Sequence, residues 1–545
     1  MPAKPVQSQN YPAWLENAIF YQVYPQSFYD SNADGIGDLP GIIHKLDYLA
    51  NIGITALWIN PCFESPFQDA GYDISDYYKV APRYGTNEDL RRLFEEARQR
   101  GMRVLLDLVP GHTSIEHPWF KASSRHKRNA YSDWYIWTGS AWEWDVPGYR
   151  AVSGLAERDA SYLANFFYFQ PALNYGFANP DPAKPWQQGV DAPGPSQVRA
   201  ELRKVMQFWL ELGASGFRVD MAGSLVKGDN DHREIKRVWG EIRAWLNRDF
   251  PEAVLVSEWS NPTVAIEAGF HMDFLLPFGT PGWGALLRKP YTPGPARDPY
   301  GTSFFDRSGR GNIREFLDNY LHHYLPTLGK CLIAFPTGNH DVNTRLSIGR
   351  SPEETKLIFL MLLAMPGVPF IYYGDEIGMR TVEGLPSVEG AYDRSGIRTP
   401  MQWDASPSAG FSAAPASQFY LALDPDPARP NVASQQSDPD SLLAAVRQLV
   451  RLRHEHPALQ ASADFKPIYA EAGRCPFVFL RTGGGERILA AINPSGQAVE
   501  VEMPEALTGN GIAEVLYGQA NTVEMRGKRT CLNLPPITGI LYKMK

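Results

Sequence analysis

The chain is poor in cysteine, in clustered basic residues and in long apolar stretches. Its 545 residues include only four cysteines, which are widely scattered without metal-type spacing: Cys62, Cys331, Cys475 and Cys531. We therefore expect buried free thiols in a reducing compartment and no disulfide framework. The net charge of −8 and the lack of any basic run argue against a nucleic-acid partner. No apolar stretch is long enough to span a membrane.

The composition is that of an ordinary globular protein. Hydrophobic residues make up 44% of the chain and charged residues 21%. A length of 545 residues exceeds one ordinary domain and suits an α/β barrel with appended domains. The first ten residues lack the apolar core of a secretory signal, so we expect a cytoplasmic protein. The oligomeric state is left open.

Strand-like and helix-like segments alternate along the first hundred residues. Apolar, β-branched runs at 18–24, 55–60 and 103–109 predict strands. Amphipathic segments at 39–52 and 87–100 predict helices between them. Repeated strand–helix units of this kind predict the parallel strands of a (β/α)8 barrel.

The alternation stops near residue 112 and resumes at a helix predicted over 198–212. The aromatic-rich segment between these points predicts an inserted small domain. We expect the eighth barrel strand at 370–374, and short strands with Gly turns beyond 460 predict an antiparallel β domain. The predicted fold is an α/β (β/α)8 TIM barrel with an insertion after strand 3 and a C-terminal antiparallel β domain. Its predicted boundaries are 12–111 and 191–458 for the barrel (domain A), 112–190 for domain B and 459–545 for the β-sandwich domain C.

Three predicted strands end at a carboxylate. The segments GFRVD, VLVSE and TGNHD stop at Asp220, Glu258 and Asp341. A single acid at a strand end is usually a turn residue or a helix cap. Three of them at the C-terminal ends of barrel strands indicate a catalytic site. Because paired carboxylates hydrolyse glycosidic bonds, the pattern favours a sugar-processing enzyme.

The local sequence favours different protonation states for two of these acids. Strand alternation puts Arg218 and Asp220 on one face, and a neighbouring cation favours the ionised, nucleophilic carboxylate. Glu258 ends an apolar strand and precedes Trp259, surroundings that favour the protonated acid. A nucleophile paired with a general acid/base is typical of a retaining glycosidase.

Five segments of the chain match the signatures of one known family. They are DLVPGH at 107–112, GFRVD, the strand ending at Glu258, NHD at 339–341 and GVPFIYYGDE at 367–376. By these segments the chain resembles the α-amylase family, glycoside hydrolase family 13. The resemblance extends over nearly its whole length. The resemblance implies that Asp220 is the nucleophile, that Glu258 is the general acid/base and that Asp341 binds and distorts the sugar. It also implies a wall around the reacting ring formed by Tyr72, His112, Arg218 and His340.

Three further segments resemble one branch of that family. The oligo-1,6-glucosidases and trehalose synthases have segments similar to QPALN at 170–174, DAGYDISDY at 69–77 and RTPMQWD at 398–404. In the first of these segments, Ala172 stands where that branch usually has Asp. In those relatives the residues that match Asp73 and Arg398 clamp a non-reducing terminal glucose. The resemblance therefore implies a blind pocket and exo action on short substrates. A turn residue and a surface charge are the alternatives for these two positions.

Two departures from the family pattern leave the linkage preference open. Gly111 stands where the family usually has Asn beside its His, so one polar contact is missing or is supplied by another residue. Met221 matches neither the Ala common in α-1,4 enzymes nor the Val common in α-1,6 enzymes. The Lys-His pair that many α-amylases use on the leaving-group side is absent as well.

A polar, glycine-containing loop follows the first predicted strand. Oxygen side chains on alternate residues predict a loop that wraps Ca²⁺, whose ligands are oxygens, and a polar turn without metal is the alternative. The same pattern occurs as a calcium loop in the relatives of the oligo-1,6-glucosidase type. We expect a structural ion remote from the chemistry and no organic cofactor. The predicted calcium ligands are Asp30, Asn32, Asp34, Ile36 and Asp38.

Together these features predict a retaining, exo-acting α-glucosidase for short α-glucosides, with water or a second sugar as acceptor. The alternative is an intramolecular isomerase of the trehalose synthase or sucrose isomerase type, which keeps the released sugar in the pocket. A non-catalytic sugar-binding protein on the same fold is disfavoured because all three carboxylates are present. The expected partner is a small oligosaccharide or disaccharide, with neither nucleic acid nor membrane.

Overall fold

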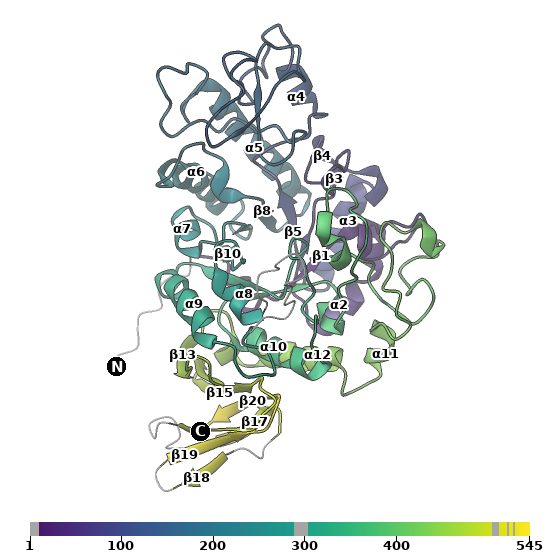
Figure 1. Cartoon of the computed structure of the whole chain (residues 1–545), viewed down its shortest axis with the longest axis vertical. Helices are drawn as coiled ribbons and strands as arrows, with labels where there is room; N and C mark the ends of the chain where they lie inside the picture. The colour runs from purple at the N-terminus through teal and green to yellow at the C-terminus, as the bar shows by residue number, and fades with distance from the viewer. Residues whose placement is uncertain (1–9, 288–302, 504–511, 520–522, 527–528) are drawn as a thin grey trace.

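A closed barrel of parallel strands forms the centre of the molecule (Figure 1). The computed structural model describes residues 10–287, 303–503, 512–519, 523–526 and 529–545. Within these ranges eight strands close the barrel in the order β1-β12-β11-β10-β9-β8-β5-β2. Their bounds are β1 Phe20–Val23, β2 Ala56–Ile59, β5 Arg103–Leu108, β8 Gly216–Val219, β9 Val254–Ser257, β10 Met272–Phe274, β11 Leu332–Pro336 and β12 Val368–Tyr372. The predicted barrel is confirmed.

Side chains alternate between the inside and the outside of the barrel, since successive strand residues point to opposite faces. Phe20, Trp58 and Phe370 belong to the inner cluster, where the rings of Phe20 and Phe370 stack at 4.3 Å. Tyr21 and Leu57 belong to the larger cluster that also contains the apolar faces of the helices. Because both layers are buried, the strands are held in a fixed register.

That register brings two of the predicted catalytic acids together. Val219 of β8 pairs with Ser257 of β9. The residues that follow are Asp220 and Glu258, and the Glu258 N–H donates to the Val219 carbonyl at 3.0 Å. The two carboxylates therefore leave adjacent strands at the same level of the barrel.

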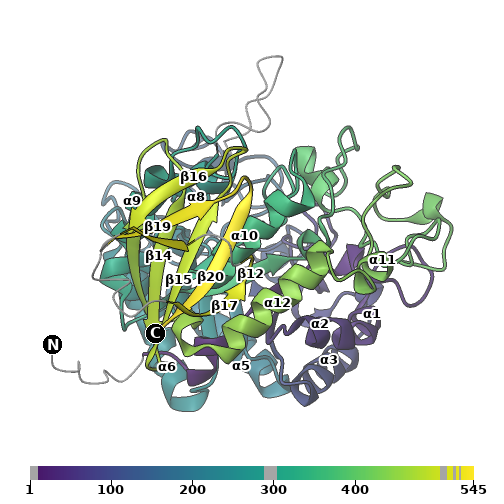
Figure 2. The same cartoon turned by 90° about the horizontal axis from the view of Figure 1, so that it is seen from below.

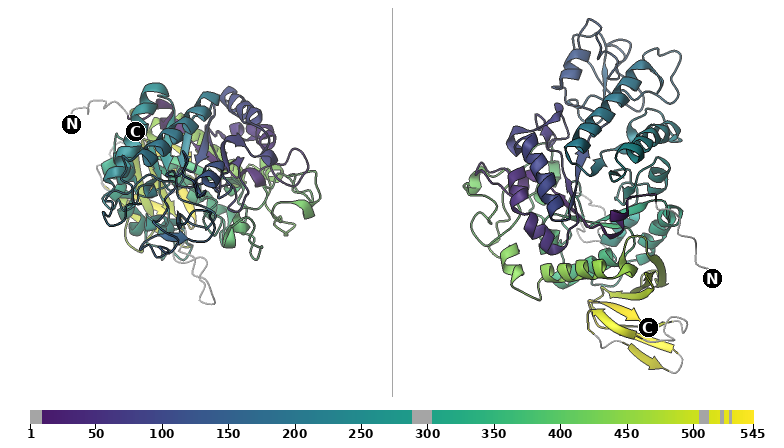
Figure 3. Two further views of the ribbon diagram at one scale, coloured as in Figure 1. Left: turned by 90° about the horizontal axis from the view of Figure 1, so that it is seen from above. Right: turned by 180° about the vertical axis from the view of Figure 1, so that it is seen from behind.

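Helices surround the barrel in the views from above and behind (Figure 3). The segment predicted as one helix at 39–52 forms two helices, because the chain breaks at Lys45. The next helix is capped by Thr86, since Thr86 and Asp89 form a reciprocal capping box. The helix bounds are α1 Leu39–His44, α2 Leu46–Ile52, α3 Asn87–Gln99, α5 Pro193–Leu212, α6 Arg233–Asp249, α7 Pro262–Glu267, α8 Pro281–Leu287, α9 Ile313–Thr327, α10 Pro352–Ala364, α11 Val432–Gln436 and α12 Leu442–Glu455.

The insertion after β5 lies at the top of Figure 1. It contains α4 (Pro118–Ser123) and the antiparallel pair β6 (Arg150–Val152) and β7 (Tyr162–Ala164). Trp137 is buried there, whereas Trp142 is 87% exposed. A small core of its own consists of Ile136, Val146, Leu163, Ala172 and Phe177. A further hairpin, β3 (Phe63–Glu64) and β4 (Asp76–Val80), lies between β2 and α3.

The C-terminal region is antiparallel, as predicted, and lies beside α10 and α12 in the view from below (Figure 2). Its two sheets have the orders β13-β14-β15-β20-β17 and β16-β19-β18. A Cβ on Gly539 would lie 2.8 Å from Leu357 of α10, so this glycine permits close packing against the barrel. The strand bounds are β13 Asp464–Tyr469, β14 Phe477–Gly483, β15 Glu486–Asn493, β16 Val499–Met503, β17 Ile512–Tyr517, β18 Val523–Arg526, β19 Arg529–Leu534 and β20 Thr538–Met544. None of the helices that the structure describes is long and apolar enough to cross a membrane.

Candidate active site

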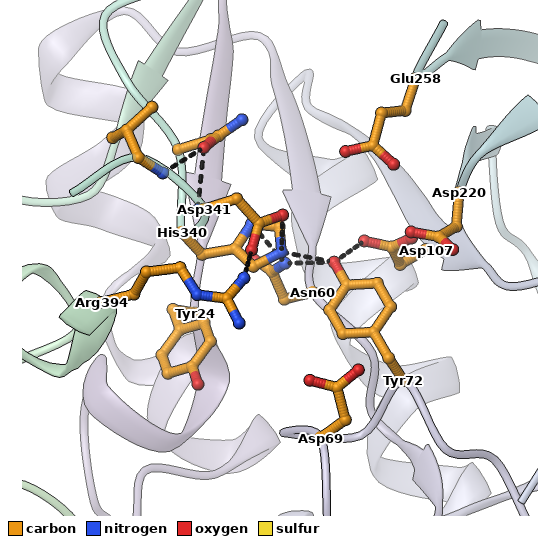
Figure 4. A network of polar contacts seen from close by, with 12 residues as sticks. Tyr24, Asn60, Asp69, Tyr72, Asp107, Asp220, Glu258, His340, Asp341 and Arg394 are labelled. Atoms are coloured by element: carbon orange, nitrogen blue, oxygen red, sulfur yellow. Dashed lines mark hydrogen bonds and ion pairs between the residues drawn. The ribbon is translucent and has the colours of Figure 1, made fainter. Parts of the chain in front are cut away.

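Arg218 lies at the centre of a group of buried acids. Its Nη1 donates to Asp107 Oδ1 at 2.8 Å and to Asp220 Oδ1 at 2.9 Å. Its Nη2 lies 2.6 Å from Glu258 Oε1. The Arg218 side chain is 1% exposed. Because one planar guanidinium contacts both predicted catalytic carboxylates, the two groups face the same space, as Figure 4 shows.

Asp341 lies across from that pair in Figure 4, after the end of β11. Its Oδ1 pairs with Arg394 and lies 3.3 Å from Arg398 Nη2. Its Oδ2 lies 3.1 Å from His340 Nε2. Asn339 Oδ1 accepts from the Asp341 N–H at 2.9 Å, which fixes the turn after the strand. Two guanidinium groups therefore hold this acid in place.

Tyr72 and His340 lie between the two groups of acids (Figure 4). Their rings stack with centroids 5.4 Å apart. The Tyr72 hydroxyl is 2.9 Å from Asp107 Oδ2 and 2.7 Å from His340 Nε2. Asn60 Nδ2 donates to that hydroxyl at 3.1 Å. His340 is fully buried behind this contact, so Tyr72 is the ring of the pair that can face a sugar.

The three predicted catalytic acids differ in proton affinity. Burial raises the pKa of Asp220 to about 7; Arg218 lowers it as expected, but burial exceeds that effect. Burial also raises the pKa of Glu258 above its ordinary range, and the neighbouring carboxylates add to the rise while Arg218 opposes it. For Asp341, burial is outweighed by the imidazole and guanidinium groups beside it, so its pKa lies below its ordinary range. Asp220 and Glu258 therefore both hold a proton more tightly than ordinary carboxyl groups do, whereas Asp341 stays ionised.

Asn165 of the insertion occupies the space beside Gly111. A Cβ on Gly111 would lie 2.9 Å from Asn165 Nδ2. That nitrogen donates to the Gly111 carbonyl at 2.9 Å and lies 3.2 Å from His112 Nδ1. Asn165 Oδ1 accepts from Lys227 Nζ at 3.2 Å. Asn165 thus supplies a carboxamide where Gly111 has no side chain.

The same contacts define the state of His112. Its Nε2 lies 3.1 Å from the Tyr72 carbonyl, which can only accept, so Nε2 carries the proton. Its Nδ1 is then the acceptor for Asn165. Burial lowers the pKa of His112 to about 4, so the ring is neutral near pH 7.

The structure places Asp73 outside the site and Asp69 at it. Asp73 is fully buried, and its carboxylate accepts from the N–H groups of Gln68 at 2.9 Å and Asp69 at 3.1 Å. Asp73 was predicted either to clamp the sugar or to be a turn residue, and these contacts are those of a turn residue. Asp69 accepts from Gln170 Nε2 at 2.7 Å, and burial raises its pKa to about 6 beside the charges of Asp341 and the arginines. Figure 4 shows Asp69 below Tyr72 and facing the space between the acids.

Sequence reasoning missed other residues of this site. Asn60 directly follows β2. The sequence could have identified it as a site residue, because polar residues at barrel-strand ends indicate function. Arg394 lies on η6 (Tyr392–Ile397), within a long polar loop that has no periodicity. Asp273 of the short strand β10 accepts from Ser257 Oγ at 2.7 Å, and its carboxylate also binds the N–H groups of the turn after Glu258.

The loop predicted to bind calcium is held by its own hydrogen bonds. Asp30 Oδ1 accepts from the Asn32 N–H at 3.0 Å, and Asn32 Oδ1 accepts from the Asp34 N–H at 3.0 Å. Asp38 caps α1 through the Gly41 N–H. Over the described ranges, no three His, Cys, Asp or Glu side chains are arranged to hold a metal ion. Calcium binding at this loop stays a prediction.

The sequence matches two family descriptions that together cover most of the chain. "Alpha amylase, catalytic domain" matches residues 22–272 and 314–462. "Maltogenic Amylase, C-terminal domain" matches residues 465–538. The chain therefore belongs to the α-amylase family of glycoside hydrolases.

Individual relatives locate it within that family. The glucan 1,6-alpha-glucosidase of Streptococcus pneumoniae serotype 4 is 30% identical over 93% of this chain and 97% of the relative. The trehalose synthase of Thermus thermophilus is 31% identical over 98% of this chain and 56% of the relative. The crystal structure of the trehalulose synthase MutB from Pseudomonas mesoacidophila MX-45 has a TM-score of 0.78 and 27% identity, covering 98% of this chain and 100% of that one. A variant of MutB has been crystallised with its substrate sucrose. The chain is thus a glycoside hydrolase of the branch that holds oligo-1,6-glucosidases, α-glucosidases and trehalose synthases.

Proposed function

We propose that this protein is a retaining, exo-acting α-glucosidase for short α-glucosides, with water or a second sugar as acceptor. The observation that carries the proposal is the contact of one guanidinium, Arg218, with both Asp220 and Glu258. Retaining enzymes hold their two carboxyl groups about 5 Å apart, and a shared guanidinium keeps them that close.

The proposed reaction has two steps. Asp220 attacks the anomeric carbon, the bond to the leaving oxygen breaks, and Glu258 gives its proton to that oxygen. The Glu258 carboxylate then takes a proton from water or a sugar hydroxyl, whose oxygen displaces Asp220 from the anomeric carbon. Two displacements give net retention. The raised pKa of Glu258 supports its role as the acid, which must be protonated when the bond to the leaving oxygen breaks.

Exo action is supported by packing on the Asp341 side. Gln170 of the insertion bonds to Asp69, and Phe167 stacks on Tyr392 with ring centroids 6.0 Å apart. A Cβ on Gly390 would lie 2.8 Å from the Gln68 carbonyl. Three segments that are distant in sequence thus meet beside Arg394 and Asp341, where a longer glucan chain would have to continue.

A cavity of about 350 Å³ lies beside the residues that follow the nucleophile in sequence. Met221, the residue after Asp220, lines it, and the Met221 N–H donates to Glu258 Oε2 at 3.2 Å. Since Glu258 is the proposed proton donor to the leaving group, the leaving group or acceptor belongs on this side. The volume suits one sugar unit, which supports short substrates.

An intramolecular isomerase is the second candidate. It is favoured by the likeness of the whole fold to a trehalulose synthase and by the relative that is a trehalose synthase. Isomerisation uses the same two displacements but keeps the leaving sugar bound and excludes water between them.

Anomer-resolving NMR with maltose, isomaltose, sucrose and trehalose, each offered separately, tests the proposal. Release of α-glucose as the first product is expected and reveals the linkage. New disaccharides with little free glucose would favour the isomerase or would show that a second sugar is the preferred acceptor. Release of β-glucose as the first product, or no turnover of any of the four, would refute the proposal. An Asp220→Asn variant is the matched control, since it removes the nucleophile with little change in size.

A further inference from the structure

The cavity beside the nucleophile contains positive charge and no negative charge. Two cationic side chains, Arg150 and Lys227, line it. None of the described residues that line it is an Asp or a Glu. This is unusual on a chain with a net charge of −8, and it is the more notable because the catalytic acids lie next to Met221 on the cavity wall.

Lys227 is the central group of this lining. It is 8% exposed, and its Nζ donates to Asn165 Oδ1 and to the Ser224 carbonyl, both at 3.2 Å. Over the described residues no carboxylate lies within ion-pair distance of its Nζ. Burial lowers the pKa of Lys227 to about 8, with no opposing effect from an acid. An ammonium has three donors, so one is left for a ligand.

A buried cation without an anionic partner is costly, and proteins normally pair it. An anion that enters the cavity would therefore stabilise the Lys227 charge. Arg150 adds a second cation at the cavity rim, where its guanidinium bonds to the Phe166 carbonyl. Both cations belong to the side where the proposed function puts the leaving group or acceptor.

We propose that this cavity selects a leaving group or acceptor that carries an anionic substituent, a phosphate or a carboxylate on a unit of sugar size. This inference rests on the proposed function, and it deepens that function by naming the charge of the second substrate. Lys227 binds the anion through its free donor, and Asn165 fixes the ammonium. Arg150 closes over the outer edge of the anion.

The experiment uses the full chain with p-nitrophenyl α-glucoside as donor. Glucose, glucose 6-phosphate and glucuronate are offered as acceptors at equal concentrations, and transfer products are quantified by chromatography. The wild type is expected to transfer to at least one anionic acceptor about tenfold or more faster than to glucose, as a charged hydrogen bond implies. Preference for glucose 6-phosphate assigns a phosphate, and preference for glucuronate assigns a carboxylate.

Substitutions identify the group responsible. Lys227→Gln keeps a donor but removes the charge, and Arg150→Gln tests the rim. Each is expected to abolish most of the anionic preference, which is measured within each variant as the ratio of transfer to the anion over transfer to glucose, so that a change in overall activity cancels. Lys121→Met, at an exposed lysine of α4, is the matched control and should keep the wild-type preference.

The outcomes separate the two proposals. Equal transfer to glucose and to both anions would overturn the charge selection, as would an anionic preference that survives both Lys227→Gln and Arg150→Gln. No release of p-nitrophenol by the wild type would instead refute the proposed function. If Lys227→Gln fails to fold, as a melting curve would show, Arg150→Gln decides alone.

Discussion

Asn165→Ala tests whether the insertion replaces the side chain that Gly111 lacks. The substitution removes one hydrogen-bond partner from each of three buried groups: the Gly111 carbonyl, His112 Nδ1 and Lys227 Nζ. A hydrogen bond contributes about 1 kcal/mol net, and Asn165 itself is only partly buried. We therefore expect a loss of about 2–3 kcal/mol in the free energy of unfolding. We also expect kcat/KM to fall about tenfold, because His112 loses the partner that orients its ring.

The reciprocal substitution makes the test sharper. Gly111→Asn alone is expected to be destabilising, since its Cβ would lie 2.9 Å from Asn165 Nδ2. In the Asn165→Ala background that atom is gone, and the next nearest, Leu225 Cδ2, is 3.5 Å away. The double variant can then present a carboxamide from residue 111. It should be more stable than the sum of the single effects predicts, by about 2 kcal/mol.

The assay is a double-mutant cycle over the wild type, the two single variants and the double variant. Urea unfolding and kcat/KM with p-nitrophenyl α-glucoside are measured for each. If the changes that the two single substitutions cause in the free energy of unfolding add up to within about 0.5 kcal/mol, the side chain at residue 111 does not take over the role of Asn165. A neutral Asn165→Ala variant would refute the reasoning at its first step.

Three further predictions concern individual acids. Because catalysis needs ionised Asp220 and protonated Glu258, kcat/KM should rise with pH through the pKa of Asp220, about 7, and fall through the pKa of Glu258. Glu258→Gln should lower kcat about 100- to 10,000-fold and remove the alkaline limb. Asp69→Asn should raise KM about tenfold with an unchanged melting temperature, whereas Asp73→Asn should lower the melting temperature by roughly 2–4 °C. Calcium added after chelation should raise the melting temperature of the wild type, but not that of Asp34→Ala.

Each of these has a result that would contradict it. A Glu258→Gln variant that keeps the alkaline limb would assign that limb to another group. Similar KM values for Asp69→Asn and the wild type would remove Asp69 from the substrate site. If calcium and sodium shift the melting curve equally, the loop at 30–38 is a polar turn without a metal.

The sequence predicted the parts of the site that depend on local pattern. Asp220 and Glu258 directly follow the apolar strands β8 and β9, and strand ends of a barrel meet at one face, so the proximity of these two acids followed from periodicity. The predicted strand at 337–341 was wrong: β11 ends at Pro336, and Asp341 lies in the turn beyond it. The choice between Asp69 and Asp73 did not follow from periodicity. Both belong to one short turn, in which Ala70 and Gly71 have φ of 49° and 99°. Left-handed backbone at two successive residues redirects the chain, and residue spacing does not indicate which acid then faces the site.

Other parts depend on contacts between distant segments. Asn165 reaches His112 across 53 residues, and Arg394 reaches Asp341 from a loop without periodicity. β10 has three residues, too few for an alternating pattern, so Asp273 gave no signal. The departure at Gly111 was visible in the sequence, but its compensation required the tertiary structure.

The number of cations that each acid contacts separates Asp341 from the acids that share Arg218. Arg218 is shared by Asp107, Asp220 and Glu258, so with all three ionised this buried group would have a net charge of −2. Such an excess is unfavourable at low dielectric, and a proton on one member relieves it. Burial and the neighbouring carboxylates raise the pKa of Glu258 above its ordinary range, so Glu258 can hold that proton and serve as the acid. Asp341 contacts two arginines and needs no proton, which suits a carboxylate that binds the sugar but transfers no proton.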